Sequence, residues 1–285
     1  MAPSGLVILM GAGPTTASGI ARILAHPSHG NMAVALLSRS ADESLAERLS
    51  RESNGGTLRA FQTDTSESSL TRAFSEIQSW SEAQHLGKLN LAIWNIKHSH
   101  KTPFADESPA KFGDSLQTYV TGAMVFAQLS SKWMLSQYAS DTTPATDSSP
   151  SDTAEVMIKK GTIIFTGTLG ALRTNPGYAA YGAGRAGVRM LAQSLAREYS
   201  PRGIHVVHAI ANGGIVDADT TEVILTKEGE DGRAKEEARK EMMSKVKLGE
   251  RIRAESVGKL YLQCMNQSCD LWVHELDMRP AREKF

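Results

Sequence analysis

Residues 11–21 read GAGPTTASGIA and directly follow the short apolar run Leu6–Met10. The apolar run predicts a buried strand, and the small and apolar residues of Ala17–Ala25 predict a helix after the turn. Glycine adopts the backbone angles of a tight strand-to-helix turn and lets a ligand approach the backbone closely. Because phosphates bind well at helix N-termini, this turn predicts a site for the pyrophosphate of a dinucleotide.

The glycine-rich turn differs from the common G-x-G-x-x-G spacing, because its last glycine falls later than expected. A glycine turn without a ligand is the alternative, and the strand before it and the helix after it favour binding. Thr15, Thr16 and Ser18 add hydroxyl groups that can donate to phosphate oxygens. The cofactor-binding residues predicted in this turn are Gly11, Gly13, Thr15, Ser18, Gly19 and Ile20.

Apolar runs and amphipathic stretches alternate along the chain. The predicted strands are Leu6–Met10, Ala33–Leu37, Leu58–Gln62, Leu89–Trp94, Thr162–Phe165, His205–Ile210 and Leu271–His274. The predicted helices are Ala17–Ala25, Glu43–Arg51, Glu67–Ala83, Pro109–Tyr138, Tyr178–Tyr199 and Ala254–Asn266. This order predicts an α/β fold of the Rossmann type, in which helices cover both faces of a doubly wound parallel sheet, as a single domain over residues 1–285.

Two stretches interrupt the alternation. Residues 139–155 are rich in Ser, Thr, Asp and Pro, which predicts a flexible surface insertion. Residues 217–251 are charged and carry narrow apolar stripes. This second stretch is either a helical lid over a binding cleft or a solvated pair of surface helices.

The composition argues against several classes of partner. The 31 basic and 31 acidic residues balance, so no overall field attracts nucleic acid or a membrane surface. The N-terminal apolar run is too short for a signal peptide or a membrane span, and Cys264 and Cys269 have no histidine cluster nearby that would complete a metal site. We expect a cytoplasmic protein with reduced thiols and without a metal.

The end of the second predicted strand indicates which dinucleotide is bound. An acidic residue there would accept from a ribose 2′-hydroxyl, but the sequence is Ser38-Arg39-Ser40. A guanidinium pairs well with a 2′-phosphate, so Ser38 and Arg39 predict NADP(H). The alternative is that Asp42 binds the ribose, although an aspartate at this place is typical of a helix N-cap.

Tyr181 and Arg185 lie four residues apart on a predicted helix and therefore share a face. A cation beside a phenol favours the phenolate, which makes Tyr181 a candidate general acid/base. From these two residues alone, a surface tyrosine beside an arginine is the simpler interpretation.

The chain resembles the short-chain dehydrogenase/reductase family along nearly its whole length. The resemblance rests on the glycine turn, on Asp64 in QTDTSE, on Asn95 in LAIWN, on TGTLGALRTNPGYAAYGAGRAG, and on ANGGI. It implies that Asp64 lies at the adenine edge, Asn95 along the cofactor, and the backbone near Gly214 and Ile215 at the nicotinamide carboxamide. Thr65, beside Asp64, is also predicted to bind the cofactor. The family's catalytic serine, tyrosine and lysine fall on Thr168, Tyr181 and Arg185.

The resemblance also locates departures from the family pattern. Thr168 keeps the serine hydroxyl, but Arg185 has a planar head that cannot relay a proton as lysine does. The family's helix asparagine falls on Tyr119, and Asp217 replaces a threonine near the cofactor phosphates.

Three functions remain open at this point. The first is an NADP(H)-dependent oxidoreductase that transfers a hydride between nicotinamide and a carbonyl, alcohol or enone of a small organic substrate. The second is a redox-inactive NADP(H)-binding regulatory protein, and the third a non-redox cyclase or isomerase. The resemblance further implies a homodimer or homotetramer that packs through the two long helices. His98 and His100 lack a third ligand nearby and are interpreted as loop residues.

Overall fold

The first strand shows how the chain builds a core on both sides of one sheet. In the computed structural model, which describes residues 2–139, 156–220 and 232–283, β1 (Leu6–Met10) is completely buried. Successive side chains of a strand point to opposite faces, so Leu6, Ile8 and Met10 join one apolar cluster while Val7 and Leu9 join the other. A strand enclosed in this way has to lie in the middle of a sheet covered by helices on both faces.

The other elements repeat this strand and helix alternation. In chain order they are α1 (Thr16–Ala25), β2 (Ala33–Ser38), α2 (Glu43–Glu52), β3 (Leu58–Gln62), α3 (Glu67–Ala83), β4 (Leu89–Trp94), α4 (Pro109–Leu116), α5 (Gly122–Ser136), β5 (Gly161–Thr168), α6 (Ala179–Tyr199), β6 (Ile204–Ala211), β7 (Ile215–Val216), α7 (Gly232–Lys247), β8 (Ile252–Arg253), α8 (Ala254–Asn266) and β9 (Glu275–Met278).

The main sheet is parallel throughout and has the order β3-β2-β1-β4-β5-β6-β9. The strand order reverses between β1 and β4, and ligands of such sheets bind beyond the carboxyl ends of the strands at this reversal. The short strands β7 and β8 pair in parallel as a separate two-stranded sheet.

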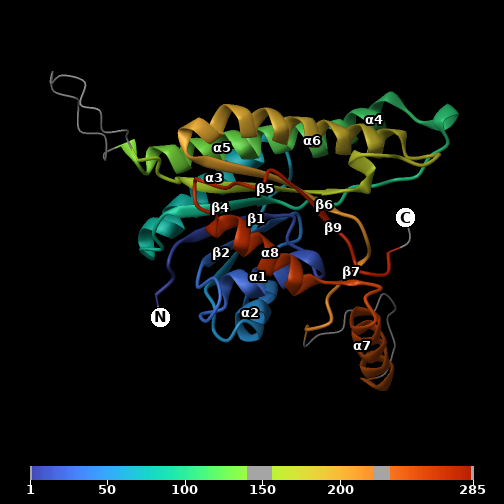
Figure 1. Cartoon of the computed structure of the whole chain (residues 1–285), viewed down its shortest axis with the longest axis horizontal. Helices are drawn as coiled ribbons and strands as arrows, with labels where there is room; N and C mark the ends of the chain where they lie inside the picture. Colours follow the sequence, from blue (N-terminus) through green and yellow to red (C-terminus); the bar gives the residue numbers. More distant parts are fainter. Residues whose placement is uncertain (1, 140–155, 221–231, 284–285) are drawn as a thin grey trace.

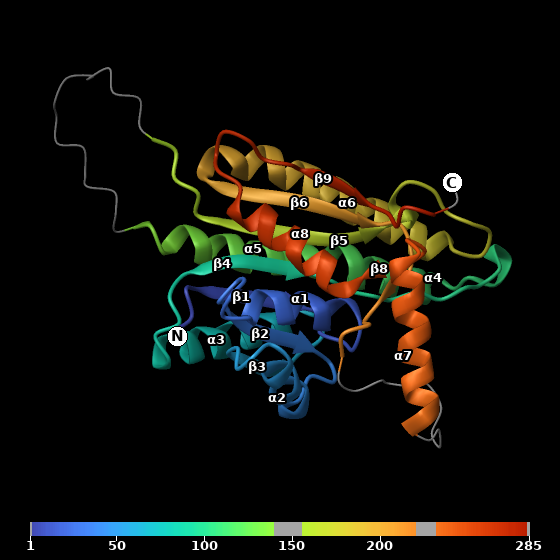
Figure 2. The ribbon, with the colours of Figure 1, turned by 60° about the horizontal axis from the view of Figure 1, so that its bottom comes forward.

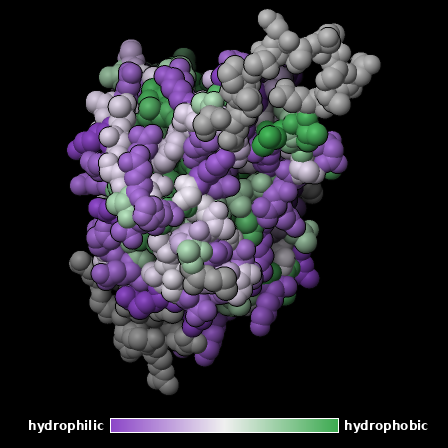
Figure 3. All heavy atoms as spheres, turned by 90° about the vertical axis from the view of Figure 1, so that its left-hand side faces the viewer, coloured by the Kyte–Doolittle hydropathy of each residue, from purple (hydrophilic) through white to green (hydrophobic). Residues whose placement is uncertain are grey.

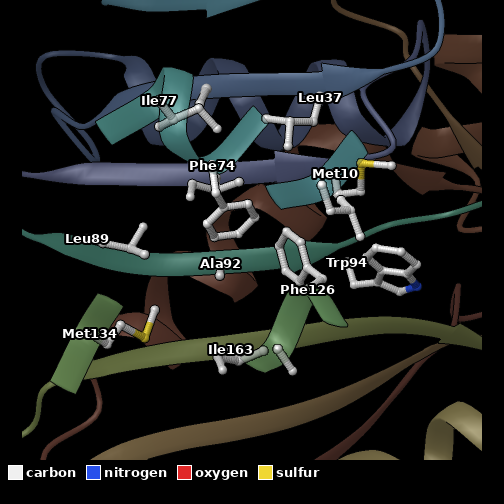
Figure 4. Packing of buried hydrophobic residues seen from close by; sticks show 14 of the residues in the cluster. Met10, Leu37, Phe74, Ile77, Leu89, Ala92, Trp94, Phe126, Met134 and Ile163 are labelled. Atoms are coloured by element: carbon white, nitrogen blue, oxygen red, sulfur yellow. The ribbon is translucent and has the colours of Figure 1, made fainter. Parts of the chain in front are cut away.

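Helices cover the sheet in two layers, as Figure 1 shows. The helices α1, α2 and α8 pack on one face, and α3, α5 and α6 on the other. Phe74 of α3 and Phe126 of α5 meet edge to face, and Trp94 of β4 lies against Phe126 (Figure 4). On the side of the molecule drawn in Figure 3, hydrophilic side chains predominate and hydrophobic ones form small separate groups. The predicted three-layer Rossmann-type fold is therefore confirmed.

Most predicted elements are present within a few residues of their expected bounds, but the last strand is wrong. The sequence places it at Leu271–His274, whereas the structure has β9 at Glu275–Met278. Trp272 instead stacks on His205, and Nδ1 of His274 bonds to the carbonyl of Val206. The residues before β9 thus pack against the start of β6. In the edge strand itself, the acidic residues Glu275 and Asp277 alternate with apolar ones.

The predicted helix Pro109–Tyr138 is also altered, because a π-helical turn at Gln117–Thr121 separates α4 from α5. Such turns widen a helix locally and are frequent at functional sites. Of the predicted insertion, only Ala139 is described. Of the predicted lid, residues 221–231 lie outside the described part, and α7 stands off from the main body beside β8 (Figure 2).

Candidate cofactor cleft and catalytic centre

A cleft of about 610 Å³ opens beyond the carboxyl ends of β1 to β4, where the strand order reverses. Its volume lies within the range of about 300–1,000 Å³ that is usual for small-molecule sites. The predicted cofactor-binding residues that line it are Gly11, Gly13, Thr15, Ser38, Arg39, Asp64, Thr65 and Asn95. Thr16, Ser40, Lys97, His98, Asp114, Gln117 and Thr118 line it as well.

The first two glycines of the turn have different physical roles. Gly11 has φ +89°, and a Cβ there would come within 2.2 Å of the carbonyl oxygen of Asn95. A Cβ at Gly13 would meet nothing closer than 3.9 Å. Gly11 is therefore required by the fold, whereas Gly13 leaves free space at the cleft where a ligand can approach the backbone.

The later residues of the turn lie beneath the cleft. The Ser18 hydroxyl is buried and donates to the carbonyl oxygen of Gly13 at 2.9 Å, so it supports the turn instead of facing a phosphate. A Cβ at Gly19 would come within 2.4 Å of the Ala254 backbone, which makes this glycine a contact between α1 and α8. Ile20 is fully buried in the same layer. Only Thr15 and Thr16 carry hydroxyls of this turn that line the cleft.

The end of β2 and the residue after it bring a hydroxyl and a guanidinium to the cleft. The Ser38 hydroxyl is buried and has no hydrogen-bond partner among the described residues, and it lies in the cleft lining beside Arg39. Asp42 accepts from the Leu45 amide at 3.0 Å and from the Ser44 hydroxyl at 2.7 Å, and these hydrogen bonds lower the pKa of its carboxyl. Asp42 is thus the N-cap of α2, as the sequence predicts.

Asp64 and Asn95 lie at the cleft end of β3 and β4. Oδ1 of Asp64 accepts from the hydroxyl of Ser66 at 2.6 Å and from its amide at 2.8 Å, which lowers the pKa of Asp64. The Asn95 side chain donates to the carbonyl oxygen of Gly11 at 3.4 Å. Asn95 therefore links the end of β4 to the glycine turn.

The structure brings the three predicted catalytic residues together at the carboxyl end of β5. The hydroxyls of Thr168 and Tyr181 lie 2.5 Å apart. Both residues are half-buried, and α6 presents Tyr181 toward the end of the strand. Two adjacent hydroxyls can together hold one substrate oxygen, and a phenol can also give it a proton.

Arg185 is only 3% exposed, and its two terminal nitrogens donate to backbone carbonyls, whereas its buried Nε has no hydrogen-bond partner among the described residues. Nη1 donates to the carbonyl oxygen of Thr166 at 3.0 Å, and Nη2 donates to that of Ile96 at 2.9 Å. The guanidinium lies 4.2 Å from the ring centre of Tyr119 and 5.3 Å from that of Tyr181. Arg185 thus links the residue that follows β4 to the end of β5 by hydrogen bonds. Its contact with Tyr181 is with the face of the ring and not with the hydroxyl.

Tyr119, on which the resemblance places the family's helix asparagine, is a buried side chain on the π-turn. Its hydroxyl accepts from the amide of His98 at 2.7 Å and also donates to the carbonyl oxygen of the same residue. Burial raises the pKa of Tyr119, although the charge of Arg185 opposes this. Tyr119 therefore fixes the loop after β4 with its hydroxyl and supports Arg185 with its ring.

Gly214 and Ile215 lie after β6, outside the lining of the cleft. The Gly214 carbonyl accepts from the amide of Ile252, and Ile215 pairs with the same residue in the β7–β8 sheet. Some of their backbone groups are therefore engaged in hydrogen bonds or strand pairing inside the protein. Their contact with the nicotinamide stays a prediction.

Asp217 does not belong to the lining of the cleft. Its carboxylate is buried and pairs with both terminal nitrogens of Arg22 on α1. Arg22 also bonds Glu52 at 2.8 Å and Glu255 at 3.2 Å. Burial disfavours the charged guanidinium, but the hydrogen bonds and charges of Asp217 and Glu52 outweigh it and raise the pKa of Arg22. The carboxylate that the sequence predicts near the cofactor phosphates is thus paired with an arginine of α1.

The two histidines after β4 each lie beside a carboxylate. His98 lies 3.0 Å from Asp114, and His100 lies 2.9 Å from Glu107. In the described ranges, no group of three or more His, Cys, Asp or Glu residues could hold a metal ion. No helix in those ranges is long and apolar enough to cross a membrane. Cys264 and Cys269 are free thiols.

Sequence reasoning missed a second hollow of about 350 Å³ beside the turn, which we call the α2 hollow. It is lined by Ala12, Gly13, Pro14, Ser40, Ser44, Leu45, Glu47, Arg48 and Arg51. The spacing of Ser44, Arg48 and Arg51 on one predicted helix face was the available signal.

Known proteins agree with this architecture. A family model described as enoyl-(acyl carrier protein) reductase matches residues 150–267. Curated protein sequences give no match. A short-chain dehydrogenase from Rhodopseudomonas palustris is 22% identical, with a TM-score of 0.65 over 97% of this chain and 98% of its own.

Two further solved structures were determined with dinucleotides. An alcohol dehydrogenase from Thermococcus sibiricus, complexed with 5-hydroxy-NADP, is 15% identical with a TM-score of 0.68 over 98% of each chain. A 3-oxoacyl-[acyl-carrier protein] reductase from Brucella melitensis, in complex with NAD, is 18% identical with a TM-score of 0.66 over 96% of this chain and 94% of its own. The family model and these structures confirm the resemblance of this chain to the short-chain dehydrogenase/reductase family of oxidoreductases, whose Rossmann-type fold it has.

Proposed function

We propose that this protein is an NADP(H)-dependent oxidoreductase that acts on a carbonyl, alcohol or enone of a small organic substrate. The observation that carries the proposal is the 2.5 Å contact between the hydroxyls of Thr168 and Tyr181 at the carboxyl end of β5. When bound, the nicotinamide supplies or takes up the hydride. Tyr181 gives or takes the proton at the substrate oxygen, and Thr168 holds that oxygen in place.

The residues of the cleft fit a phosphorylated dinucleotide. Gly13 leaves space for close approach to the backbone, and the buried Ser38 hydroxyl lacks a partner among the described residues. Arg39 lines the cleft while the nearby carboxylate of Asp42 is engaged in capping α2. This combination favours a 2′-phosphate over a free 2′-hydroxyl.

Arg185 acts in this proposal as a positioning residue. By bonding the carbonyls of Thr166 and Ile96, it holds the ends of β5 and β4 in a fixed relation. Thr168 lies on the first of these segments, so the arginine keeps its hydroxyl aligned with Tyr181.

The test is NADPH oxidation with a panel of aldehydes, ketones and enones. Tyr181→Phe is expected to lower kcat by about 10²- to 10⁴-fold while NADPH affinity stays unchanged. Tyr178→Phe is the matched control, because this neighbouring ring lies 6.0 Å from that of Tyr181. If no substrate is turned over and Tyr181→Phe changes no measured property, the proposal is wrong.

A second candidate, a redox-inactive nucleotide-binding protein, is favoured by one observation. The terminal nitrogens of Arg185 bond backbone carbonyls, so the arginine does not take over the proton relay of a lysine. Tight NADPH binding without turnover of any carbonyl or alcohol would support this second function.

We further propose a cytoplasmic homodimer or homotetramer with residues 217–251 as a substrate lid. The free thiols of Cys264 and Cys269 suit a reducing compartment. Met124 of α5 and Met190 of α6 expose 39% and 58% of their surface on the two long helices, which suits a subunit contact. Light scattering after gel filtration tests the assembly, and a monomer would contradict it.

A further inference from the structure

Helix α6 directs three polar side chains at the strands of the sheet, at intervals of four residues. Tyr181, Arg185 and Arg189 therefore share one face of the helix. Arg189 is half-buried and donates to both carboxylate oxygens of Glu275, at 2.6 Å and 2.7 Å. Glu275 belongs to β9, the edge strand beside β6 (Figure 2). This helix face thus runs from the catalytic centre to the edge of the sheet.

A buried histidine of β6 lies on the same side of the sheet. His208 follows Val206 by two residues, and Val206 belongs to the apolar cluster that includes residues of α6, so both side chains point to one face. His208 is 1% exposed, and its Nδ1 lies 3.3 Å from Oε2 of Glu275. The hydrogen bond from Arg189 lowers the pKa of Glu275, which keeps it an ionised acceptor. Nδ1 of His208 therefore carries the proton of the neutral ring, and Nε2 keeps its lone pair.

The Nε2 atom lies against the strand that ends in Thr168. It is buried and has no hydrogen-bond partner among the described residues. A Cβ at Gly167 would come within 2.2 Å of this atom, so the ring occupies the space that a side chain would need. Gly167 directly precedes Thr168, and the carbonyl of Thr166 accepts from Arg185. Two side chains thus contact the two residues before Thr168.

His208 suits this position only as a neutral ring. Burial lowers the pKa of His208, the hydrogen bond and charge of Glu275 oppose this, and the charges of Arg189 and Arg185 add to the lowering. These are the charged groups of β9 and α6 around the ring, and the residue of β5 against it is a glycine. A proton on Nε2 would face Gly167 without an acceptor and add a third positive charge beside two arginines.

We infer that His208 is a positioning residue, whose neutral ring packs against Gly167 and keeps the Thr168 hydroxyl in place. The inference rests on the proposed function, in which Thr168 holds the substrate oxygen. Loss of the ring leaves space beside Gly167 into which the end of β5 can move. Protonation of the ring displaces it from the two arginines and has the same consequence.

The experiment measures kcat for NADPH oxidation by the wild type, His208→Ala and His208→Asn at a series of pH values. His208→Ala is expected to lower kcat about 10- to 100-fold, because a small displacement of a reacting group is costly. The Kd for NADPH should stay unchanged, since His208 does not line the cleft. His208→Asn keeps an amide that can donate to Glu275 and does not titrate. This variant should retain more activity than His208→Ala, and its kcat should fall less than that of the wild type below pH 6.5.

Gly167→Ala tests the same contact from the opposite side. Gly167 is not among the glycines with positive φ, so an alanine backbone is tolerated there, but its methyl group would displace the His208 ring. The single variant should therefore lose kcat. In the double variant with His208→Asn, the shorter amide leaves room for the methyl, and the loss should be smaller than the product of the two single losses. If the single losses multiply, the two residues do not act through their contact, and the inference is wrong.

His205→Gln is the matched control, because His205 is a buried histidine of the same strand that bonds the carbonyls of Cys264 and Val273. It is expected to change the Tm and to leave kcat unchanged at temperatures where the protein is folded. If it lowers kcat as much as His208→Ala, the loss of any buried histidine of β6 explains the effect and the inference falls.

The outcomes separate this inference from the proposed function. If the wild type turns over a substrate and His208→Ala keeps its kcat, the inference is wrong while the proposed function stands. If His208→Ala does not fold, the pH profile of His208→Asn decides, and a profile equal to that of the wild type overturns the inference. If the wild type turns over no carbonyl or alcohol, both are wrong.

Discussion

Replacing Arg185 with lysine, the residue that the sequence resemblance implies for this position, is expected to destabilise this protein. The arginine is almost fully buried and bonds two carbonyl oxygens with separate nitrogens. A lysine ammonium that bonds one of these oxygens leaves the other without its donor. The contact of the planar Arg185 guanidinium with the Tyr119 ring, whose centre lies 4.2 Å away, is also lost.

The magnitude follows from these contacts. An unsatisfied buried carbonyl costs about 1–3 kcal/mol, and loss of the cation–π contact adds about 0.5–1 kcal/mol. Arg185→Lys should therefore lower the free energy of unfolding by about 1.5–4 kcal/mol. For a chain of this size, that corresponds to a decrease in Tm of about 3–7 °C.

Thermal and urea unfolding, followed by circular dichroism, measure the effect. Arg197→Lys is the matched control, since Arg197 is an exposed arginine on the same helix. If Arg185→Lys unfolds within about 1 °C of the wild type and turns over carbonyl substrates tenfold faster, Arg185 does not hold the ends of β4 and β5. In that case the natural chain would be specialised away from ordinary reduction.

Three further predictions concern the turn, the ion-pair network and a buried histidine. Gly13→Leu should abolish nucleotide binding with an unchanged Tm, because a side chain there enters open space at the cleft, whereas Gly11→Ala should cost more than about 1 kcal/mol of stability at its positive φ. Calorimetric titration and thermal unfolding of both variants check this pair, and a reversed pattern would disprove it. Asp217→Asn weakens the pairing with Arg22 and should lower stability by about 1.5–3 kcal/mol in urea unfolding, where an unchanged midpoint would contradict the role of the pair. Burial lowers the pKa of His205 to about 4 from 6.5, so only the unfolded chain takes up this proton between those values, and stability should fall by about 3 kcal/mol as the pH drops from 6.5 to 4. In the His205→Gln variant, the free energy of unfolding should depend less on pH, whereas His29→Gln, at an exposed position, should leave the pH dependence unchanged. Equal pH profiles for the wild type and both variants would refute this prediction.

The sequence predicts the fold because most of its strands are buried on both faces and therefore apolar throughout. β1 has this character throughout and β4 has it at every position except Asn90, and the predicted bounds of both strands are those of the structure. The edge strand β9 is different, because Glu275 and Asp277 alternate with apolar residues and the preceding apolar residues pack elsewhere. Periodicity does not distinguish an apolar segment that covers a strand from one that forms a strand.

The candidate site is predictable where local geometry decides it. The approach of Tyr181 to Thr168 follows from a strand end and a helix start that the motif already contains. The partners of Arg185 are backbone carbonyls, which leave no signal in the side-chain sequence. The buried partners of Arg22 lie on α2, on the segment after β7 and on α8, so their meeting depends on the complete fold.

The stacking of Arg185 on Tyr119 has a consequence for how this sequence can vary. The Tyr119 hydroxyl bonds the His98 backbone, and the Tyr119 ring lies against the Arg185 guanidinium. The two side chains therefore pack against each other in the same buried space. Exchange of either one alone leaves a void or an unbonded carbonyl, and the pair should change only in a concerted way. In a double-mutant cycle, Tyr119→Asn and Arg185→Lys should therefore be strongly non-additive, with the double variant less impaired than the sum of the single ones.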